Sequence, residues 1–197
     1  MELGPSGFPF EKYVAAILQH KGYVVQTDQI IKGHCVNHEV DVVATKNREI
    51  FMVECKYHNH TGIICDVKIP LYIKARFDDI VQQERETPGS GLVFTKGWLV
   101  TNTRFSSDAL EYGTCSGLYL VGWDFPRHES LKEMIDASGL HPVTCLTTLT
   151  GKEKQRLLDK RVVLCKELLQ NRQTLLDMNI ASNRLEAILR EADTLCK

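Results

Sequence analysis

The sequence lacks the features that mark several specialised classes of protein. No apolar run approaches the roughly 18 residues that a membrane-spanning helix requires, so we expect no membrane partner. The first residues carry no basic segment ahead of their apolar stretch, which predicts that they are not a secretory signal peptide. The seven cysteines are an odd number without the spacing of a disulfide framework. We therefore expect reduced thiols in a cytoplasmic protein.

The chain also lacks an overall charge of one sign. Its formal net charge is −1 at pH 7, so the global basic charge typical of many nucleic-acid-binding proteins is missing. The charge is unevenly distributed, however. Residues 1–150 carry more acidic than basic side chains, whereas residues 151–197 carry more basic than acidic ones. This distribution permits a localised contact with DNA and does not demand one.

Hydrophobic periodicity predicts an α/β core. The chain has 197 residues, which suits one domain, or one domain with a helical appendage. The expected elements, in order, are a helix at 8–21, strands at 23–31, 36–45 and 49–57, a helix at 67–84, a strand at 97–103, a helix capped by Ser106 or Ser107, a strand at 117–123 and a helix at 128–139.

The composition changes to helical patterning near the end of the chain, which predicts a core domain at 1–145 and a helical extension at 146–197. We expect two tail helices at 152–172 and 183–196. Asn183 and Glu186 have the spacing of a capping box for the second helix. The end of the tail also resembles a helix-hairpin-helix unit joined at Asn179, and the alternative is a helix pair used for packing or dimerisation.

The hairpin formed by the second and third strands predicts a pair of opposed acids. With Asn47–Arg48 at the turn, Lys46 faces Glu49 and Asp41 faces Glu54. Opposed residues have Cβ atoms roughly 4.5–5.5 Å apart, where two like charges are destabilising unless they are neutralised. A divalent cation neutralises them, and oxygen ligands select Mg²⁺ or Mn²⁺. A backbone carbonyl, such as that of Cys55, is a further ligand.

Strand alternation places Lys56 on the same face as Glu54, and Cys55 on the opposite face. An ammonium group in that position can hold an attacking water or offset charge on a phosphate, while a metal polarises the phosphoryl oxygen. The structural alternative is a solvated strand end with an ordinary ion pair.

These residues resemble the PD-(D/E)XK restriction-endonuclease-like superfamily, in its Mrr-type branch. The matching residues are Glu11 in "FEKYVAAIL", Asp41 in "HEVDVVA", and Glu54 with Lys56 in "VECKYH". The later stretch "WLVTNTRFSSDALEYG" is similar to the corresponding part of Mrr-type members, so the resemblance spans about residues 8–140. The chain also resembles the nuclease portion of bacterial proteins that carry an ATP-cone domain, which implies either a longer form with that domain or a shorter homologue without it.

The resemblance implies a helix, a three-strand antiparallel meander, a second helix and further strands in a mixed central sheet. It also implies a Mg²⁺-dependent (or Mn²⁺-dependent) DNA endonuclease, in which Asp41 and Glu54 bind the metal and Lys56 positions the water. Glu11 is then an auxiliary metal or water ligand. The alternative is a catalytically inactive DNA-binding or interaction module on the same fold. Paired cuts in a duplex favour a homodimer.

Several other side chains are candidates for binding. Cys35 with His38 and Cys55 with His58 have the spacing of zinc ligands, although alternation puts Cys55 and His58 on opposite faces. We expect His58 to flank the cleft as an auxiliary residue instead. The expected DNA-phosphate contacts, with solvated side chains as the alternative, are Lys74, Arg76, Asn102 and Arg104.

Overall fold

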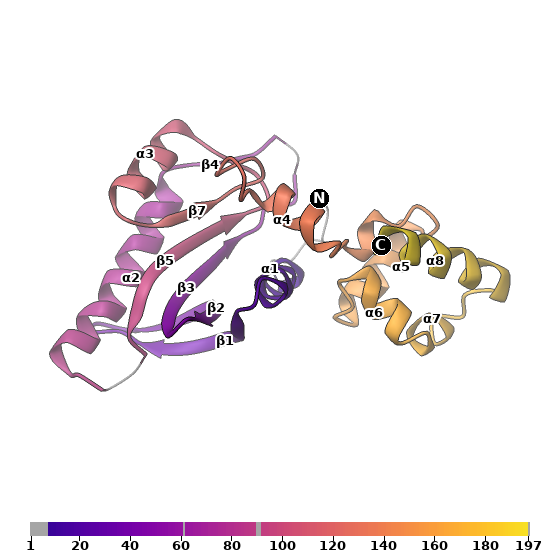
Figure 1. Cartoon of the computed structure of the whole chain (residues 1–197), viewed down its shortest axis with the longest axis horizontal. Helices are drawn as coiled ribbons and strands as arrows, with labels where there is room; N and C mark the ends of the chain where they lie inside the picture. Colours follow the sequence, from indigo (N-terminus) through magenta and orange to yellow (C-terminus); the bar gives the residue numbers. More distant parts are fainter. Residues whose placement is uncertain (1–7, 61, 90–91, 197) are drawn as a thin grey trace.

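The computed structural model describes residues 8–60, 62–89 and 92–196. The core is built from α1 (Phe8–His20), β1 (Val24–Lys32), β2 (Asn37–Lys46), β3 (Glu49–Lys56), β4 (Ile64–Cys65), α2 (Lys68–Glu86), β5 (Phe94–Thr101), β6 (Arg104–Phe105), α3 (Ser107–Cys115), β7 (Tyr119–Val121) and α4 (Leu131–Ser138). The rest of the described chain forms η1 (Val143–Cys145), α5 (Gly151–Asp159), α6 (Cys165–Gln170), α7 (Gln173–Leu176) and α8 (Ser182–Leu195). Figure 1 shows this helical tail beside the sheet-containing core.

A five-stranded mixed sheet forms the centre of the core, in the order β1-β2-β3-β5-β7. The first three strands form an antiparallel meander, whereas β5 pairs in parallel with both β3 and β7. The predicted mixed α/β fold with a helical tail is therefore confirmed. The short parallel pair of β4 with β6 was not predicted, because two-residue strands carry no periodicity.

The hairpin between β2 and β3 has the predicted turn and register. Asn47 and Arg48 both have positive φ, at 53° and 68°, as the two central residues of a type I′ turn require. Lys46 pairs with Glu49, and the ladder continues to Val42 opposite Val53. Because the side-chain period of a strand is two residues, this register decides which side chains of β2 and β3 share a face.

Helices cover both faces of the sheet. The cluster on one face joins β-strand residues such as Val53 and Val100 to α1, α4 and the tail helices. The cluster on the opposite face joins Met52 and Leu99 to α2 and α3. In Figure 1, α2 and α3 lie on one side of the sheet, and α1 lies on the other, between the sheet and the tail. The central strand β3 is therefore buried from both sides.

The tail differs from its prediction. The single helix expected at 152–172 was wrong, because the chain breaks between α5 and α6, where Arg161 has a φ of 61°. The break lets Val163 and Leu164 turn inward and allows Leu164 to pair with Pro142. The predicted capping box was also wrong, since α8 begins after Ala181 with no side-chain cap.

Contacts with α1 hold the tail on the core. The hydroxyl of Tyr13 donates to the carbonyl of Leu140 at 2.6 Å, and Lys12 Nζ pairs with Glu167 at 2.8 Å. Within the part of the chain that is described, no helix is long and apolar enough to span a membrane.

Candidate active site

Two carboxylates meet where β2 and β3 lie side by side. The β2–β3 register, extended by one pair beyond Val42 and Val53, places Asp41 opposite Glu54. Asp41 Oδ2 accepts a hydrogen bond of 2.7 Å from the backbone N–H of Cys55. Asp41 is half-buried, and Glu54 is only 4% exposed. The fold thus brings together the two acids that the sequence analysis paired.

Arg76 of α2 lies against this pair. Its guanidinium donates to Glu54 Oε2 and to the backbone carbonyl of Glu39. Both members of the ion pair are largely buried, with side-chain exposures of 12% for Arg76 and 6% for Glu54. The second oxygen, Glu54 Oε1, is buried and has no hydrogen-bond partner among the described residues. In this structure Arg76, which is an expected phosphate contact, compensates the charge of a candidate metal ligand.

The environment of these acids favours their protonated forms. Burial, and then the negative charge of Asp41, raises the pKa of Glu54 to about 8, although Arg76 acts in the opposite direction. Burial also raises the pKa of Asp41, despite the hydrogen bond from Cys55. A positive charge close to these carboxyl groups would favour their ionised forms.

Glu11 of α1 belongs to the same electrostatic environment. It is half-buried, and its pKa rises to about 7, first through burial and then through the charges of Asp41, Asp28 and Glu39. The fold therefore brings the acid of α1 near the end of the hairpin, as the sequence resemblance predicted.

Asp28 is an acid that the sequence analysis missed. It lies between Thr27 and Gln29, which pair with Val42 and Val40, so it stands beside Asp41 on the neighbouring strand. Its φ of 55° interrupts the regular geometry of β1. The signal in the sequence was an aspartate in the middle of a predicted strand. Aspartate is depleted in strands and tolerates positive φ.

Lys56 ends β3 two residues beyond Glu54 and is half-buried. The Thr101 hydroxyl donates to its backbone carbonyl at 2.7 Å, which fixes the strand end. The pKa of the nearby His58 is lowered, first by burial and then by the positive charge of Lys56. The lysine charge therefore lies within electrostatic reach of the segment that follows β3.

Comparison with known proteins gives matches at both ends of the chain. A restriction endonuclease family model matches residues 5–68, and a model described as AF1548-like, C-terminal, matches residues 141–196. An uncharacterized protein of Archaeoglobus fulgidus is 32% identical over 183 residues, covering 91% of this chain and 97% of that protein. The chain belongs to the AF1548-like family. Its core has a restriction-endonuclease-like fold.

A solved member of this group has the same overall architecture. The crystal structure of a protein of unknown function, AF1548, is 29% identical and superposes with a TM-score of 0.77. The match covers 97% of this chain and 98% of that chain. The similarity therefore extends through both the sheet-containing core and the helical tail.

Restriction-endonuclease-like domains generally use divalent metals, and the donors in this family member fit such an ion. In the chain as described, no group of three or more His, Cys, Asp or Glu side chains could hold a metal ion. The available donors are the carboxylates of Asp41 and Glu54 together with a backbone carbonyl such as that of Cys55. These are hard oxygen donors of the kind that Mg²⁺ prefers, and the unpartnered Glu54 Oε1 is free to contact a cation.

The zinc alternative receives no support from the described residues, which contain no cluster of His and Cys ligands. His38 Nε2 instead lies 2.7 Å from Asp79 Oδ2, in a contact that ties β2 to α2. The pKa of the Cys55 thiol is raised well above its ordinary value by burial, which disfavours the thiolate that zinc binds.

The other expected DNA contacts occupy three different settings. Asn102 is buried and forms two hydrogen bonds of 2.8 Å with the backbone N–H and carbonyl of His58. Lys74 pairs with Asp78 along α2. The guanidinium of Arg104 is 2.7 Å from Asp124, and its side chain is 73% exposed. Asn102 therefore fixes the chain after β3, whereas Arg104 keeps most of its surface open to solvent.

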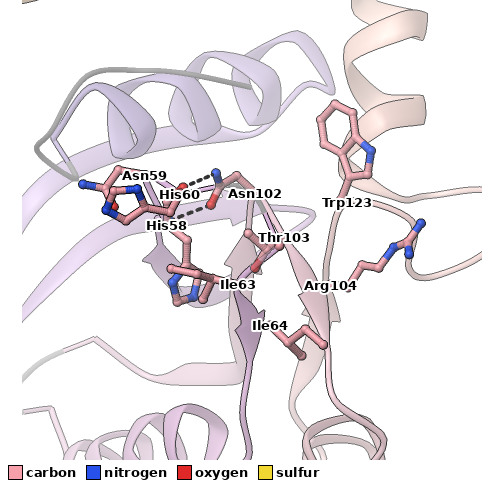
Figure 2. Close-up of a pocket in the computed structure, with 10 residues that line it drawn as sticks. His58, Asn59, His60, Ile63, Ile64, Asn102, Thr103, Arg104 and Trp123 are labelled. Carbon is pink, nitrogen blue, oxygen red and sulfur yellow. Dashed lines mark hydrogen bonds between the residues drawn. The ribbon is translucent and has the colours of Figure 1, made fainter.

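A pocket of about 520 Å³ opens beyond the carboxyl ends of β3 and β5. Figure 2 shows the histidines from the segment after β3 on one side and Arg104 and Trp123 on the other. It is lined by His58, Asn59, His60, Gly62, Ile63, Ile64, Asn102, Thr103, Arg104 and Trp123. His58 Nε2 is buried, with no hydrogen-bond partner in the described segments. Three of the expected site residues, His58, Asn102 and Arg104, therefore line one pocket.

Proposed function

We propose that the protein is a divalent-metal-dependent DNA endonuclease that hydrolyses phosphodiester bonds. The observation that carries this proposal is the opposed, buried pair of Asp41 and Glu54, with Lys56 two residues further along the same strand. The restriction-endonuclease-like fold is compatible with this function but does not determine it. The support comes from the site, which supplies the groups that metal-dependent hydrolysis needs.

In this proposal Asp41, Glu54 and the carbonyl of Cys55 hold Mg²⁺ or Mn²⁺. The bound ion supplies a Lewis acid for the phosphate and lowers the pKa of a water molecule. Lys56 orients the attacking water and offsets charge that develops on the phosphate. Glu11, whose pKa of about 7 leaves it partly protonated near neutral pH, holds or accepts a proton at its carboxylate.

Arg76 has two roles in this scheme. Without a cation, it compensates the buried charge of Glu54, which would otherwise be costly to bury. If Glu54 held a cation in place of this partner, the guanidinium would be available to a phosphate oxygen on the same side of the sheet. In this scheme Arg76 contacts DNA phosphate, as the sequence analysis predicted. We propose that Lys74 and Arg104 also contact phosphate.

Plasmid nicking tests the proposal. Wild-type protein is incubated with supercoiled DNA in Mg²⁺, Mn²⁺ or EDTA, and compared with Asp41→Ala and Lys56→Ala. We expect metal-dependent nicking that falls about 100-fold or more in both variants, the order of loss when a transition-state contact is removed. The exposed residues Glu111 and Lys132 supply matched control substitutions to Ala that retain full activity. Equal residual nicking in every preparation would identify a contaminant and overturn the proposal.

The second candidate is an inactive DNA-binding or interaction module. The Arg76–Glu54 ion pair favours it, because the guanidinium occupies one carboxylate oxygen of the candidate metal ligand. An inactive module would bind DNA equally well in EDTA and in Mg²⁺ and would release no product. Arg76→Ala discriminates further, since it frees Glu54 and should tighten Mg²⁺ binding in the nuclease, as measured by calorimetry. A homodimer, an ATP-cone domain in a longer form and a cytoplasmic location remain predictions from the sequence.

A further inference from the structure

The pocket after β3 has no assigned ligand. We propose that it holds one unpaired base of the DNA strand, beside the phosphate that is cut. The proposal rests on the proposed nuclease function and extends it, because it makes DNA with an unpaired nucleotide the preferred substrate class.

The position of the pocket connects it to the candidate active site. Lys56 ends β3, and His58, two residues later, lines the pocket. Two residues of extended chain span at most about 7 Å, and successive nucleotides of one strand rise by about 3.4 Å along the axis of a duplex. Burial raises the pKa of Cys65 in β4, and the positive charge of Lys56 acts in the opposite direction. The same strand brings Ile64 to the pocket. A base in the pocket and a phosphate at Lys56 can therefore belong to neighbouring nucleotides.

The lining matches the surface of a nucleobase, which has two flat apolar faces and a polar edge. Ile63 and Ile64 are 39% and 55% exposed and offer apolar contact. The Trp123 side chain packs against the larger hydrophobic cluster, so its orientation is fixed while it also lines the pocket. Aromatic rings of this kind stack on bases with little preference for sequence. His58 and Thr103 supply polar groups that can contact the edge of the base.

The polar part of the pocket is positioned before any ligand arrives. The two hydrogen bonds between Asn102 and the backbone N–H and carbonyl of His58 hold this segment in place. Arg104 at the rim has a mostly exposed guanidinium suited to a phosphate oxygen. A phosphate alone would leave the isoleucine and tryptophan surfaces without a role.

The size of the pocket selects an unpaired base. A volume of about 520 Å³ lies in the range of roughly 300–1,000 Å³ typical of small-molecule sites, so the pocket has room for a single base. A paired base keeps both faces stacked on its neighbours, and an enzyme reaches those faces only when the base is unpaired or extruded.

The experiment compares three oligonucleotide duplexes that are identical except at one position next to the cut. One is fully paired, one carries an unpaired nucleotide, and one carries an abasic nucleotide at the same place. We expect kcat/KM in Mg²⁺ to be about tenfold higher for the unpaired base than for the other two. Trp123→Ala should remove this preference and leave the abasic substrate unchanged, whereas Trp123→Phe should keep it. Val24→Ala, which removes an exposed apolar side chain on β1, is the matched control.

The outcomes separate this inference from the proposed function. If Asp41→Ala cleaves the same duplexes as well as wild type, the nuclease assignment fails. If cleavage depends on Asp41 but the three duplexes react alike, or Trp123→Ala slows them all equally, only the pocket inference fails. If nothing is cleaved, the same comparison is made by Kd, with 2-aminopurine fluorescence at the unpaired position as readout. Equal affinities would then overturn the inference, and tighter Trp123-dependent binding of the unpaired base would support it.

Discussion

At the residue scale, the environment of Glu54 explains why its pKa is raised although Arg76 lies against it. One carboxylate oxygen contacts Arg76, and the other has no partner in the described part of the chain. Asp41 lies across the hairpin and adds a second negative charge. Burial, and then the charge of Asp41, raises the pKa of Glu54 to about 8, because Arg76 offsets these effects only in part. In the proposed nuclease, a bound cation would reduce this cost of ionising Glu54.

The raised pKa predicts how stability depends on pH. Glu54 and Glu11 bind protons more tightly in the folded state, at pKa values of about 8 and about 7, than at their ordinary value of 4.5. Their stabilising contribution is therefore complete below pH 4.5 and is lost as pH rises through the folded pKa. In EDTA, we expect the free energy of unfolding to decrease from pH 5 to pH 8.5. The decrease between pH 7 and pH 8 should come mainly from Glu54, whose folded pKa is the higher of the two.

Glu54→Gln removes that group from the titration. By urea denaturation, the decrease between pH 5 and pH 8.5 should be smaller in this variant by on the order of 2 kcal/mol, while the exposed-acid control Glu111→Gln keeps the wild-type slope. Adding Mg²⁺ should offset the decrease in wild type. A variant with the same pH profile as wild type would contradict the raised pKa.

At the element scale, the β2–β3 hairpin controls whether the acids meet. A shift of its register by one residue would move Asp41 to the opposite face from Glu54. The turn that fixes this register contains Arg48, a residue other than glycine whose backbone φ is 68°. Positive φ costs an L-residue other than glycine roughly 1–2 kcal/mol, and Asn47 before it is a residue type that tolerates such a conformation. The hairpin is therefore formed at some cost in local strain.

Arg48→Gly should relieve this strain. The change produces Asn-Gly, the preferred pair for a type I′ turn, and part of the gain is offset by the greater freedom of glycine in the unfolded chain. We expect the free energy of unfolding to increase by about 0.5–1 kcal/mol. Chemical denaturation measures it, with the exposed Lys132→Gly in α4 as a control that should be destabilising. A loss of stability in Arg48→Gly would contradict the assigned turn.

At the scale of the whole molecule, α1 links the nuclease-like core to the tail. One hydrophobic cluster runs from the sheet residues Val53 and Trp98 through α1 to Leu168 and Ile188 in the tail. The buried hydrogen bond from Tyr13 to Leu140 lies in this region. Because α1 packs against both parts, we expect them to unfold together.

Tyr13→Phe tests this coupling, since it leaves the buried Leu140 carbonyl without its partner. We expect the variant to lose about 1–2 kcal/mol of stability. Tryptophan emission reports on the core through Trp98, and labelling of the buried Cys165, followed by mass spectrometry, reports on the tail. Both midpoints should shift together. Two separate transitions, or a shift in one probe alone, would show that the tail unfolds independently.

Local patterning in the sequence determined the elements that build the site. The alternation in β2 and β3, and the two-residue turn between them, were sufficient to predict the register that brings Asp41 and Glu54 together. The helix α3 was likewise predictable, with a cap at Ser106 or Ser107, and the structure shows Ser106 as the cap, whose side chain accepts from Ala109 three residues later. These features depend on residues close together in the chain, so they can be predicted from the local sequence pattern.

Only the tertiary structure decided how distant segments use these elements. The placement of Arg76 on Glu54, of Asn102 on the backbone of His58, and of Asp28 beside Asp41 depends on which segments become neighbours. The break between α5 and α6 likewise follows from the inward packing of Val163. Sequence alone determined which chemical groups end the strands. Long-range packing decided their partners, because burial and charge pairing are properties of the assembled core rather than of any local pattern.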